Sequence, residues 1–298
     1  MDPTSASIRR APDAVRRDQK DQIILRVAAL TDELRMRSLA AGGSVLTSHG
    51  IITPRISPTV SFVVDPGSVG HLAAVLRERG WHTVSSGRRR LLPSMRLALG
   101  HPDFAPTLSL FSVLPGFFAD PEDVFDLMWD DRSAVRVRGT TVRALSRLFS
   151  AILAVHDSLD GRLQRGATHF DFFAEQFSRV LSAEERARLG AVVKRAGACM
   201  EMRPLLISLG VEPCPFVLPS DEYVRWRLQT ATPTDQARRL VALVDLPRGT
   251  RRQLYRLSSS PPLTPADVVR NARELPRTIR TVRAAHRRWH DDEVLGTI

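Results

Sequence analysis

The chain has few cysteines, few lysines and no long apolar run. Its 298 residues contain 2 cysteines, Cys199 and Cys214, whose spacing fits neither a metal site nor a thiol nucleophile with a neighbouring histidine and acid. No segment reaches the ~18 consecutive apolar residues that a membrane-spanning helix needs. The polar, charged segment 1–21 lacks the apolar centre of a secretory signal peptide. These absences predict a cytoplasmic protein with free thiols and no contact with a membrane.

Positive charge in this sequence comes almost entirely from arginine. The formal net charge is +11, and the lysines are Lys20 and Lys194. A basic balance indicates a polyanionic partner such as RNA, but a composition rich in Arg and Ala with almost no Lys is also typical of a genome rich in G and C. The segment 265–289 carries a basic stripe at helical spacing, formed by Arg277, Arg280, Arg283 and Arg287. We favour a solvated helix face for this stripe, with contact to nucleic acid or a docking partner as the alternatives.

The first half of the sequence alternates between helical and extended patterns. Apolar residues recur at helical spacing over 22–40 and 68–79, and the second of these segments is followed by Gly80. β-Branched and apolar residues predict strands at 57–64, 81–84 and 107–114, the first followed by an Asp-Pro-Gly turn. We therefore expect a sheet in this half of the chain.

After about residue 142, helical patterns separated by proline and glycine predominate. They cover 142–159, 170–181, 183–209, 221–230, 233–244 and 265–289. We predict an α/β N-terminal domain, a mixed sheet with flanking helices, followed by an all-α C-terminal domain. The predicted boundaries are a flexible N-terminus at 1–20, the α/β domain at 21–140 and the helical domain at 141–298.

The first domain contains an ordered series of short motifs. Residues 55–64 read Arg-Ile-Ser-Pro-Thr-Val-Ser-Phe-Val-Val, followed by Asp65-Pro66. Further along come Leu-Ser-Leu-Phe at 108–111, Trp129, and the run Gly-Thr-Thr-Val-Arg-Ala-Leu-Ser at 139–146. The series resembles an uncharacterised family of bacterial nucleotidyltransferases of the polymerase-β-like superfamily, whose signature strand reads Arg-x-Ser-Gly-Asp-x-Asp-Leu-Leu-Val. The resemblance covers roughly residues 25–210 and implies a nucleotidyltransferase-like fold for the α/β domain.

The sequence departs from that family at the positions of its metal ligands. Thr59 and Ser61 stand where the family has its two signature aspartates, and Ser109 stands where it has a third carboxylate on a neighbouring strand. Two-metal phosphoryl transfer needs carboxylates, because Mg²⁺ prefers hard anionic oxygen ligands. The resemblance therefore implies a degenerate site, for which we expect no cofactor, no metal and no catalytic residue.

Four further residues are candidates for nucleotide binding or for a displaced carboxylate at the same site. Arg55 and Ser57 match the family and suit phosphate oxygens, so they are candidate nucleotide-binding residues. Asp65 shares the strand parity of Ser61, and Asp103 precedes the third strand, so either could supply a displaced carboxylate. A turn aspartate and a loop aspartate are the simpler interpretation.

We predict from these observations a nucleotidyltransferase-fold protein without catalysis, acting as a binding or accessory protein with an unknown protein or peptide partner. The alternative is an active nucleotidyltransferase with displaced carboxylates, which would use Mg²⁺ and a nucleoside triphosphate to modify a small molecule, a peptide or RNA. A third hypothesis, an RNA-binding module, rests on charge alone.

Overall fold

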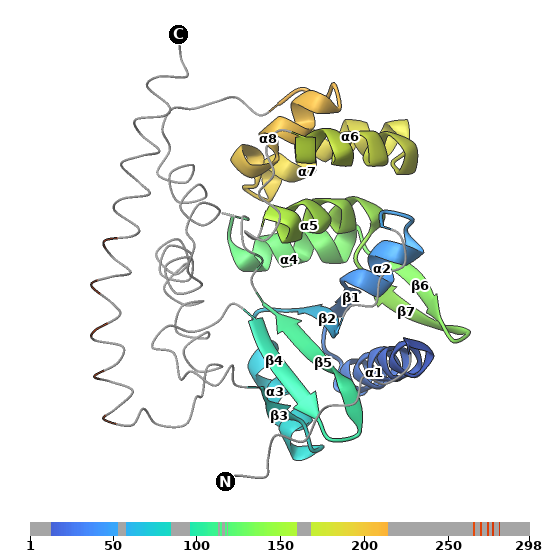
Figure 1. The fold of residues 1–298 in the computed structure, drawn as a ribbon, viewed down its shortest axis with the longest axis vertical. Coiled ribbons are helices and arrows are strands. Elements are labelled where there is room, and N and C mark those ends of the chain that lie inside the picture. The colour runs from blue at the N-terminus through green and yellow to red at the C-terminus, as the bar shows by residue number, and fades with distance from the viewer. Residues whose placement is uncertain are drawn as a thin grey trace.

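The fold was obtained as a computed structural model (Figure 1). It describes residues 13–52, 58–84, 96–112, 114, 117, 119–159 and 168–213, together with 265, 269, 273, 276 and 280. Residues 13, 156–159, 168–171, 200, 201 and 204 are described by their backbone alone. No helix in these ranges is long and apolar enough to cross a bilayer.

The centre of the molecule is a 7-stranded sheet with the order β3-β4-β5-β2-β1-β7-β6. The strands are β1 (Ser38–Ala41), β2 (Thr59–Val64), β3 (His82–Thr83), β4 (Arg96–His101), β5 (Phe104–Phe111), β6 (Ser133–Val137) and β7 (Thr140–Ala144). The sheet is mixed, since β2 runs parallel to β5 and β1 parallel to β7, while the other neighbours are antiparallel.

Helices cover both faces of this sheet (Figure 1). One core contains α1 (Asp13–Glu33) and α3 (Val69–Glu78), which pack on alternate residues of β2 such as Val60 and Phe62. The other core contains α2 (Gly43–Ser48), α4 (Pro121–Asp130) and α5 (Arg147–Leu159), and it includes Val63 of β2. This division follows from the period of 2 in a strand, which sends neighbouring side chains to opposite faces.

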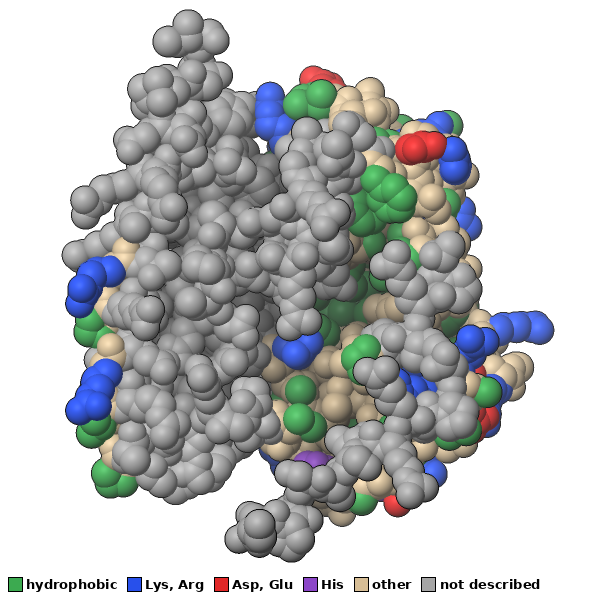
Figure 2. Space-filling model, viewed as in Figure 1, with side chains coloured by type: hydrophobic (Ala, Val, Ile, Leu, Met, Phe, Trp, Pro, Cys, Tyr) green, Lys and Arg blue, Asp and Glu red, His purple; other side chains and the backbone are tan. Residues whose placement is uncertain are grey.

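Three more helices extend the second core away from the sheet. They are α6 (Thr168–Val180), α7 (Ala183–Arg195) and α8 (Cys199–Ser208), and their buried apolar residues belong to the same cluster as those of α4 and α5. In Figure 1 they form a layer on the far side of α4 and α5 from the sheet. On the face seen in Figure 2, basic side chains stand at the margins of the described surface and apolar ones gather between them.

The predicted mixed sheet with flanking helices is confirmed. The strand expected at 57–64 is β2, the helix at 68–79 is α3, the strand at 81–84 is β3, and the helix at 170–181 is α6. Three elements, α2, β4 and α4, were not predicted from the sequence. The last two lie close to segments rich in proline or arginine, where the apolar pattern is short.

The helix expected over 22–40 is wrong in its second half. α1 ends at Glu33, the backbone of Arg35 takes a left-handed φ of 54°, and residues 38–41 form β1. All residues of β1 are buried, because the strand lies between β2 and β7 in the middle of the sheet. A short apolar run fits a helix or a buried strand equally well, and pairing with neighbouring strands decides between them.

Three other boundaries needed correction. The helix expected at 142–159 begins only at Arg147, because residues 140–144 pair with β6 as the second strand of a hairpin. The helix expected at 183–209 is divided into α7 and α8 at Gly197, which has a left-handed φ of 69°. The strand expected at 107–114 runs from Phe104 to Phe111.

The border that we place between residues 140 and 141 falls inside β7, and the change from strands to helices comes after Ala144. Of the helices expected after residue 213, those at 221–230 and 233–244 lie outside the described residues. Pro265, Val269, Arg273, Pro276 and Arg280 are helical and exposed.

The prediction of free thiols is wrong for Cys199, which is disulfide-bonded at the start of α8. Cys214 lies outside the described residues. The prediction of a cytoplasmic location therefore loses the part of its support that came from free thiols.

Candidate functional site

Hydroxyl side chains from β2 and β5 lie together on one face of the sheet. The two strands are adjacent and parallel, and their register places Thr59 beside Thr107 and Ser61 beside Ser109. The intervening residues belong to the core of the opposite face, so these hydroxyls share the face that carries Val63. Neighbouring strands are about 5 Å apart. We call the set Thr59, Ser61, Thr107 and Ser109 the hydroxyl face.

Members of the hydroxyl face differ in burial. Ser109 is 1% exposed, whereas Thr59, Ser61 and Thr107 are half-buried and remain accessible from solution. The Ser109 Oγ has no hydrogen-bond partner. Buried hydroxyl groups in native proteins are nearly always hydrogen-bonded, and an exception needs a physical reason. Ser109 is thus a polar group held without a partner at the floor of the hydroxyl face.

The backbone of Gly42 lies close beside the hydroxyl face. It lies between β1 and α2, has a φ of 77°, and a Cβ added there would meet the Ser61 Oγ at 3.1 Å. Its left-handed φ suits glycine, because a Cβ is strained in that region. The absence of a side chain allows the backbone to lie close to Ser61.

An arginine lies next to the hydroxyl face on β4. Ala98 pairs with Ser109 and Arg96 pairs with Phe111, so Arg96 is on the same face and is a diagonal neighbour of Ser109. Diagonal Cβ atoms in such a pair are about 7–8 Å apart, which long side chains can span. Arg96 is exposed.

Sequence reasoning missed both Arg96 and Thr107. The signal for Thr107 was present, since it has the same strand parity as Ser109 two residues away. Arg96 could not be found in the same way because β4 was not predicted as a strand.

Asp65 does not reach the hydroxyl face. It follows β2, and its Oδ2 accepts hydrogen bonds from Nε of Arg37 at 2.9 Å and from Nη2 at 2.7 Å. Its Oδ1 accepts a hydrogen bond from the backbone N–H of Gly67 in the turn before α3. Asp65 is therefore held in a turn and an ion pair.

Arg37 joins Asp65 to a second acid on α4. Its Nη1 donates to Oδ1 of Asp126 at 2.6 Å, and its guanidinium lies over the ring of Phe125. Burial opposes the charge of Arg37, but the hydrogen bonds and charges of the two aspartates outweigh burial and raise its pKa. Asp65 and Asp126 are thus both paired with Arg37.

Asp103 lies far from the hydroxyl face. It is in the turn between β4 and β5, six residues before Ser109, with a side chain 74% exposed beside His101. Six strand residues span about 20 Å. Asp103 therefore stands at the opposite end of β5.

Most of the other predicted site residues lie outside the residues that the structure describes. Arg55 and Ser57 lie outside the described residues, as do Arg277, Arg283 and Arg287 of the basic stripe. Arg280 is helical and exposed. Within the described ranges, no group of three or more His, Cys, Asp or Glu side chains is arranged to hold a metal ion.

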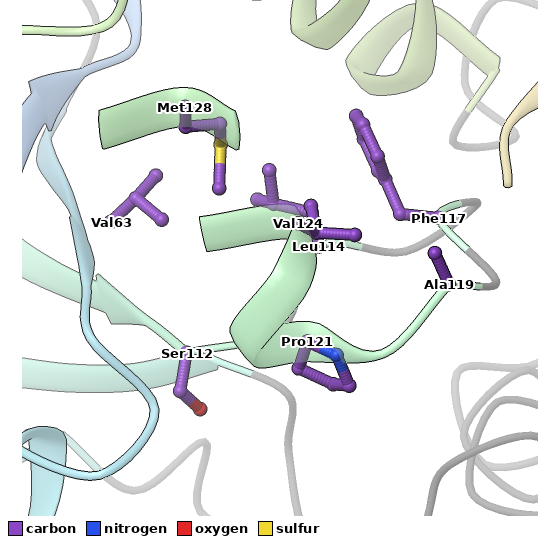
Figure 3. Close-up of a pocket in the computed structure, with 8 residues that line it drawn as sticks. All are labelled: Val63, Ser112, Leu114, Phe117, Ala119, Pro121, Val124 and Met128. Atoms are coloured by element: carbon purple, nitrogen blue, oxygen red, sulfur yellow. The ribbon is translucent and has the colours of Figure 1, made fainter. Parts of the chain in front are cut away.

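A small pocket lies beyond the hydroxyl face, where β2 and β5 end (Figure 3). Its lining is mainly apolar and comes from Val63, Ser112, Leu114, Phe117, Ala119, Pro121, Val124 and Met128. The cavity volume is about 10 Å³, which is about the smallest that holds one water molecule. This pocket is too small for a nucleotide, so the hydroxyl face is the stronger candidate site.

Comparison with known proteins adds a structural similarity. No family model and no curated protein matches this chain. Among solved structures, an antigenic nucleotidyltransferase-like protein from Paracoccidioides brasiliensis is similar, with 17% sequence identity and a TM-score of 0.40. The match covers 66% of this chain and 95% of that one.

Proposed function

We propose that this chain is a nucleotidyltransferase-fold protein that has lost two-metal catalysis and acts as a binding or accessory protein. The observation that carries the proposal is the register of β2 and β5, which sets the uncharged Ser61 and Ser109 side by side. The sequence motifs place these residues at the metal-ligand positions of the family they resemble, where phosphoryl transfer through two metals requires carboxylates.

The chemistry of the hydroxyl face supports the loss of catalysis. Mg²⁺ prefers anionic oxygens in octahedral geometry and loses its bound water reluctantly, so neutral hydroxyls bind it only weakly. Arg96 on the same face supplies no oxygen ligand for a metal. The role that this face supports is recognition of a ligand or of a protein or peptide partner.

The rival hypothesis of an active enzyme needs carboxylates in place of the missing ones. The predicted replacements lie elsewhere, Asp65 in its ion pair with Arg37 and Asp103 at the far end of β5. No observation on the described residues favours this rival.

Metal binding tests the proposal directly. Calorimetric titration with Mn²⁺, a sensitive substitute for Mg²⁺, is expected to give no binding in the wild type. The double variant Thr59→Asp, Ser61→Asp places carboxylates at the two half-buried positions and is the positive control. Binding of Mn²⁺ by the wild type, or Mg²⁺-dependent transfer of a labelled nucleotidyl group from ATP, GTP, CTP or UTP to any acceptor, would overturn the proposal.

A further inference from the structure

We propose that the outer edge of β6 binds an extended acidic segment of a partner protein, which adds to the sheet as a further strand. β6 is the last strand in the sheet order, and within the described residues it pairs with β7 alone. The hairpin of β6 and β7 stands at the end of the sheet opposite β3 (Figure 1). This edge is separate from the hydroxyl face on β2 and β5, so the inference goes beyond the proposed function and is tested independently of it.

The turn of the hairpin determines which backbone groups of β6 face β7. Arg138 and Gly139 have φ values of 49° and 81°, and they join the paired residues Val137 and Thr140. Positive φ at both loop positions is typical of a two-residue type I′ hairpin, in which the two residues that flank the loop are hydrogen-bonded to each other. The N–H and C=O of Val137 therefore point toward β7.

Ala134 and Arg136 present their backbone groups along the outer edge. Hydrogen-bonded pairs alternate with non-hydrogen-bonded pairs in an antiparallel ladder. Arg136, opposite Thr141, and Ala134, opposite Arg143, therefore turn their N–H and C=O groups away from β7. None of these groups has a hydrogen bond to another described residue, and both side chains are exposed. Such an edge is a template for main-chain pairing with an added strand.

Positive charge on this edge selects an acidic strand. Arg136 is exposed, and no carboxylate of the described residues pairs with it. Arg132, directly before β6, is also exposed, and its Nη1 donates to the carbonyl oxygen of Trp129 at 2.7 Å, not to an acid. In an added strand, the residue opposite Arg136 lies on the same face with its Cβ about 5 Å away, and opposite charges in such a pair stabilise it. An Asp or Glu at that position thus matches the edge.

The same charge argues against a second copy of this chain as the occupant. Antiparallel pairing of two β6 edges would bring Arg136 of both copies onto one face of the joined sheet. Like charges on neighbouring strands destabilise their pairing, and charged edge residues commonly prevent association between edges. An acidic segment meets no such repulsion. Arg136 therefore opposes self-pairing and favours the acidic partner at the same time.

The test is the fluorescence anisotropy of a labelled peptide, Val-Glu-Val-Thr-Val-Glu-Val with both ends blocked, titrated with the full chain. Its Glu and Thr side chains share one strand face, and its Val side chains share the other. We expect saturable binding, and binding about tenfold weaker or less for the matched peptide with Lys in place of Glu. Arg136→Glu should reverse this preference. Arg195→Glu is the matched control, an exposed position on α7 where the same change should leave both affinities unchanged.

N-Methylation of the peptide separates strand addition from a general attraction between charges, and it leaves the protein unaltered. With the Glu side chains on the face of Arg136, the Thr amide of the peptide points toward β6 and the Val amides point away. Methylation of the Thr amide should weaken binding about tenfold, and methylation of a neighbouring Val amide should not weaken it. The proposal is overturned, with the loss of catalysis left standing, by no saturable binding, by equal binding of the Glu and Lys peptides, or by equal effects of the two methylations. A dimer in analytical ultracentrifugation that Ala134→Pro dissociates would also overturn it, because a second copy would then occupy the edge.

Discussion

Replacing Ser109 by alanine should stabilise the protein. The Ser109 Oγ is buried in β5 and has no hydrogen-bond partner, so the folded state carries a desolvation penalty of about 1–3 kcal/mol that alanine removes. Part of this gain is lost with the packing of the oxygen atom, and we expect the free energy of unfolding to rise by about 1 kcal/mol. In a chain of this size that corresponds to an increase in Tm of about 2–4 °C.

Ser146 provides a control of opposite sign. It is also buried, but its Oγ accepts a hydrogen bond from the backbone N–H of Phe149 at the start of α5. Ser146→Ala removes a helix cap and should lower the free energy of unfolding by about 1 kcal/mol. Urea denaturation of both variants gives the comparison. A Ser109→Ala variant that loses stability as Ser146→Ala does would refute the argument, because Ser109 would then have a partner.

The substitution Ser109→Asp examines the same position with a charge. A carboxylate buried without a partner should lower the free energy of unfolding by about 3–5 kcal/mol at neutral pH. Burial raises the pKa of such a group above its unfolded value, so the loss should shrink as the pH falls and the acid becomes neutral. Urea denaturation at neutral and acidic pH measures this change. Recovery of stability on addition of Mg²⁺ to this single variant would mean that the hydroxyl face still holds a metal.

The remaining predictions concern the surroundings of the site. Gly42→Ala should lower the free energy of unfolding by about 2–3 kcal/mol, because the added Cβ is strained and also meets Ser61. Gly139 has a similar φ of 81° but open space around it, so Gly139→Ala should lower the free energy of unfolding by only the backbone strain of about 1–2 kcal/mol. Equal losses in urea denaturation would contradict the close approach of Gly42 to the hydroxyl face. Arg37→Met removes two ion pairs, one of them with a largely buried aspartate, and should lower the free energy of unfolding by about 1–2 kcal/mol. The control is Arg79→Met, which removes an exposed ion pair and should change the free energy of unfolding by less than about 0.5 kcal/mol. Burial lowers the pKa of Lys20, so its charge destabilises the fold at neutral pH and this penalty disappears as the pH rises toward 10.5. The substitution Lys20→Met should therefore stabilise the protein at neutral pH by an amount that decreases in alkaline solution, and a pH-independent difference in Tm would count against this explanation.

Elements with an unambiguous period could be predicted from the sequence. The run at 59–64 is β-branched, is bounded by proline and Asp-Pro-Gly, and forms β2. The apolar spacing of 69–78 with a glycine after it forms α3. In both cases the local pattern and the tertiary position agree, so propensity and packing select the same structure.

Elements whose pattern is short were decided by their neighbours. Residues 38–41 continue the apolar pattern of α1, yet they form β1 because they pair with β2 on one side and β7 on the other. The same holds for residues 140–144, which pair with β6 in a hairpin instead of beginning α5. Hydrogen bonding in a sheet is a property of the assembled strands, and a single sequence does not contain it.

The candidate site likewise has features that the local sequence determines and features that depend on the tertiary structure. The sequence by itself determined that Thr59, Ser61 and Ser109 carry hydroxyls and no charge, and that Thr59 and Ser61 share a strand face, since residue type and the period of 2 are local properties. Only the tertiary structure decided that Ser61 and Ser109 are neighbours, that Arg96 joins them, and that Asp65 is bound by Arg37. These relations join residues far apart in the chain, and they exist because parallel pairing of β2 with β5 fixes one register.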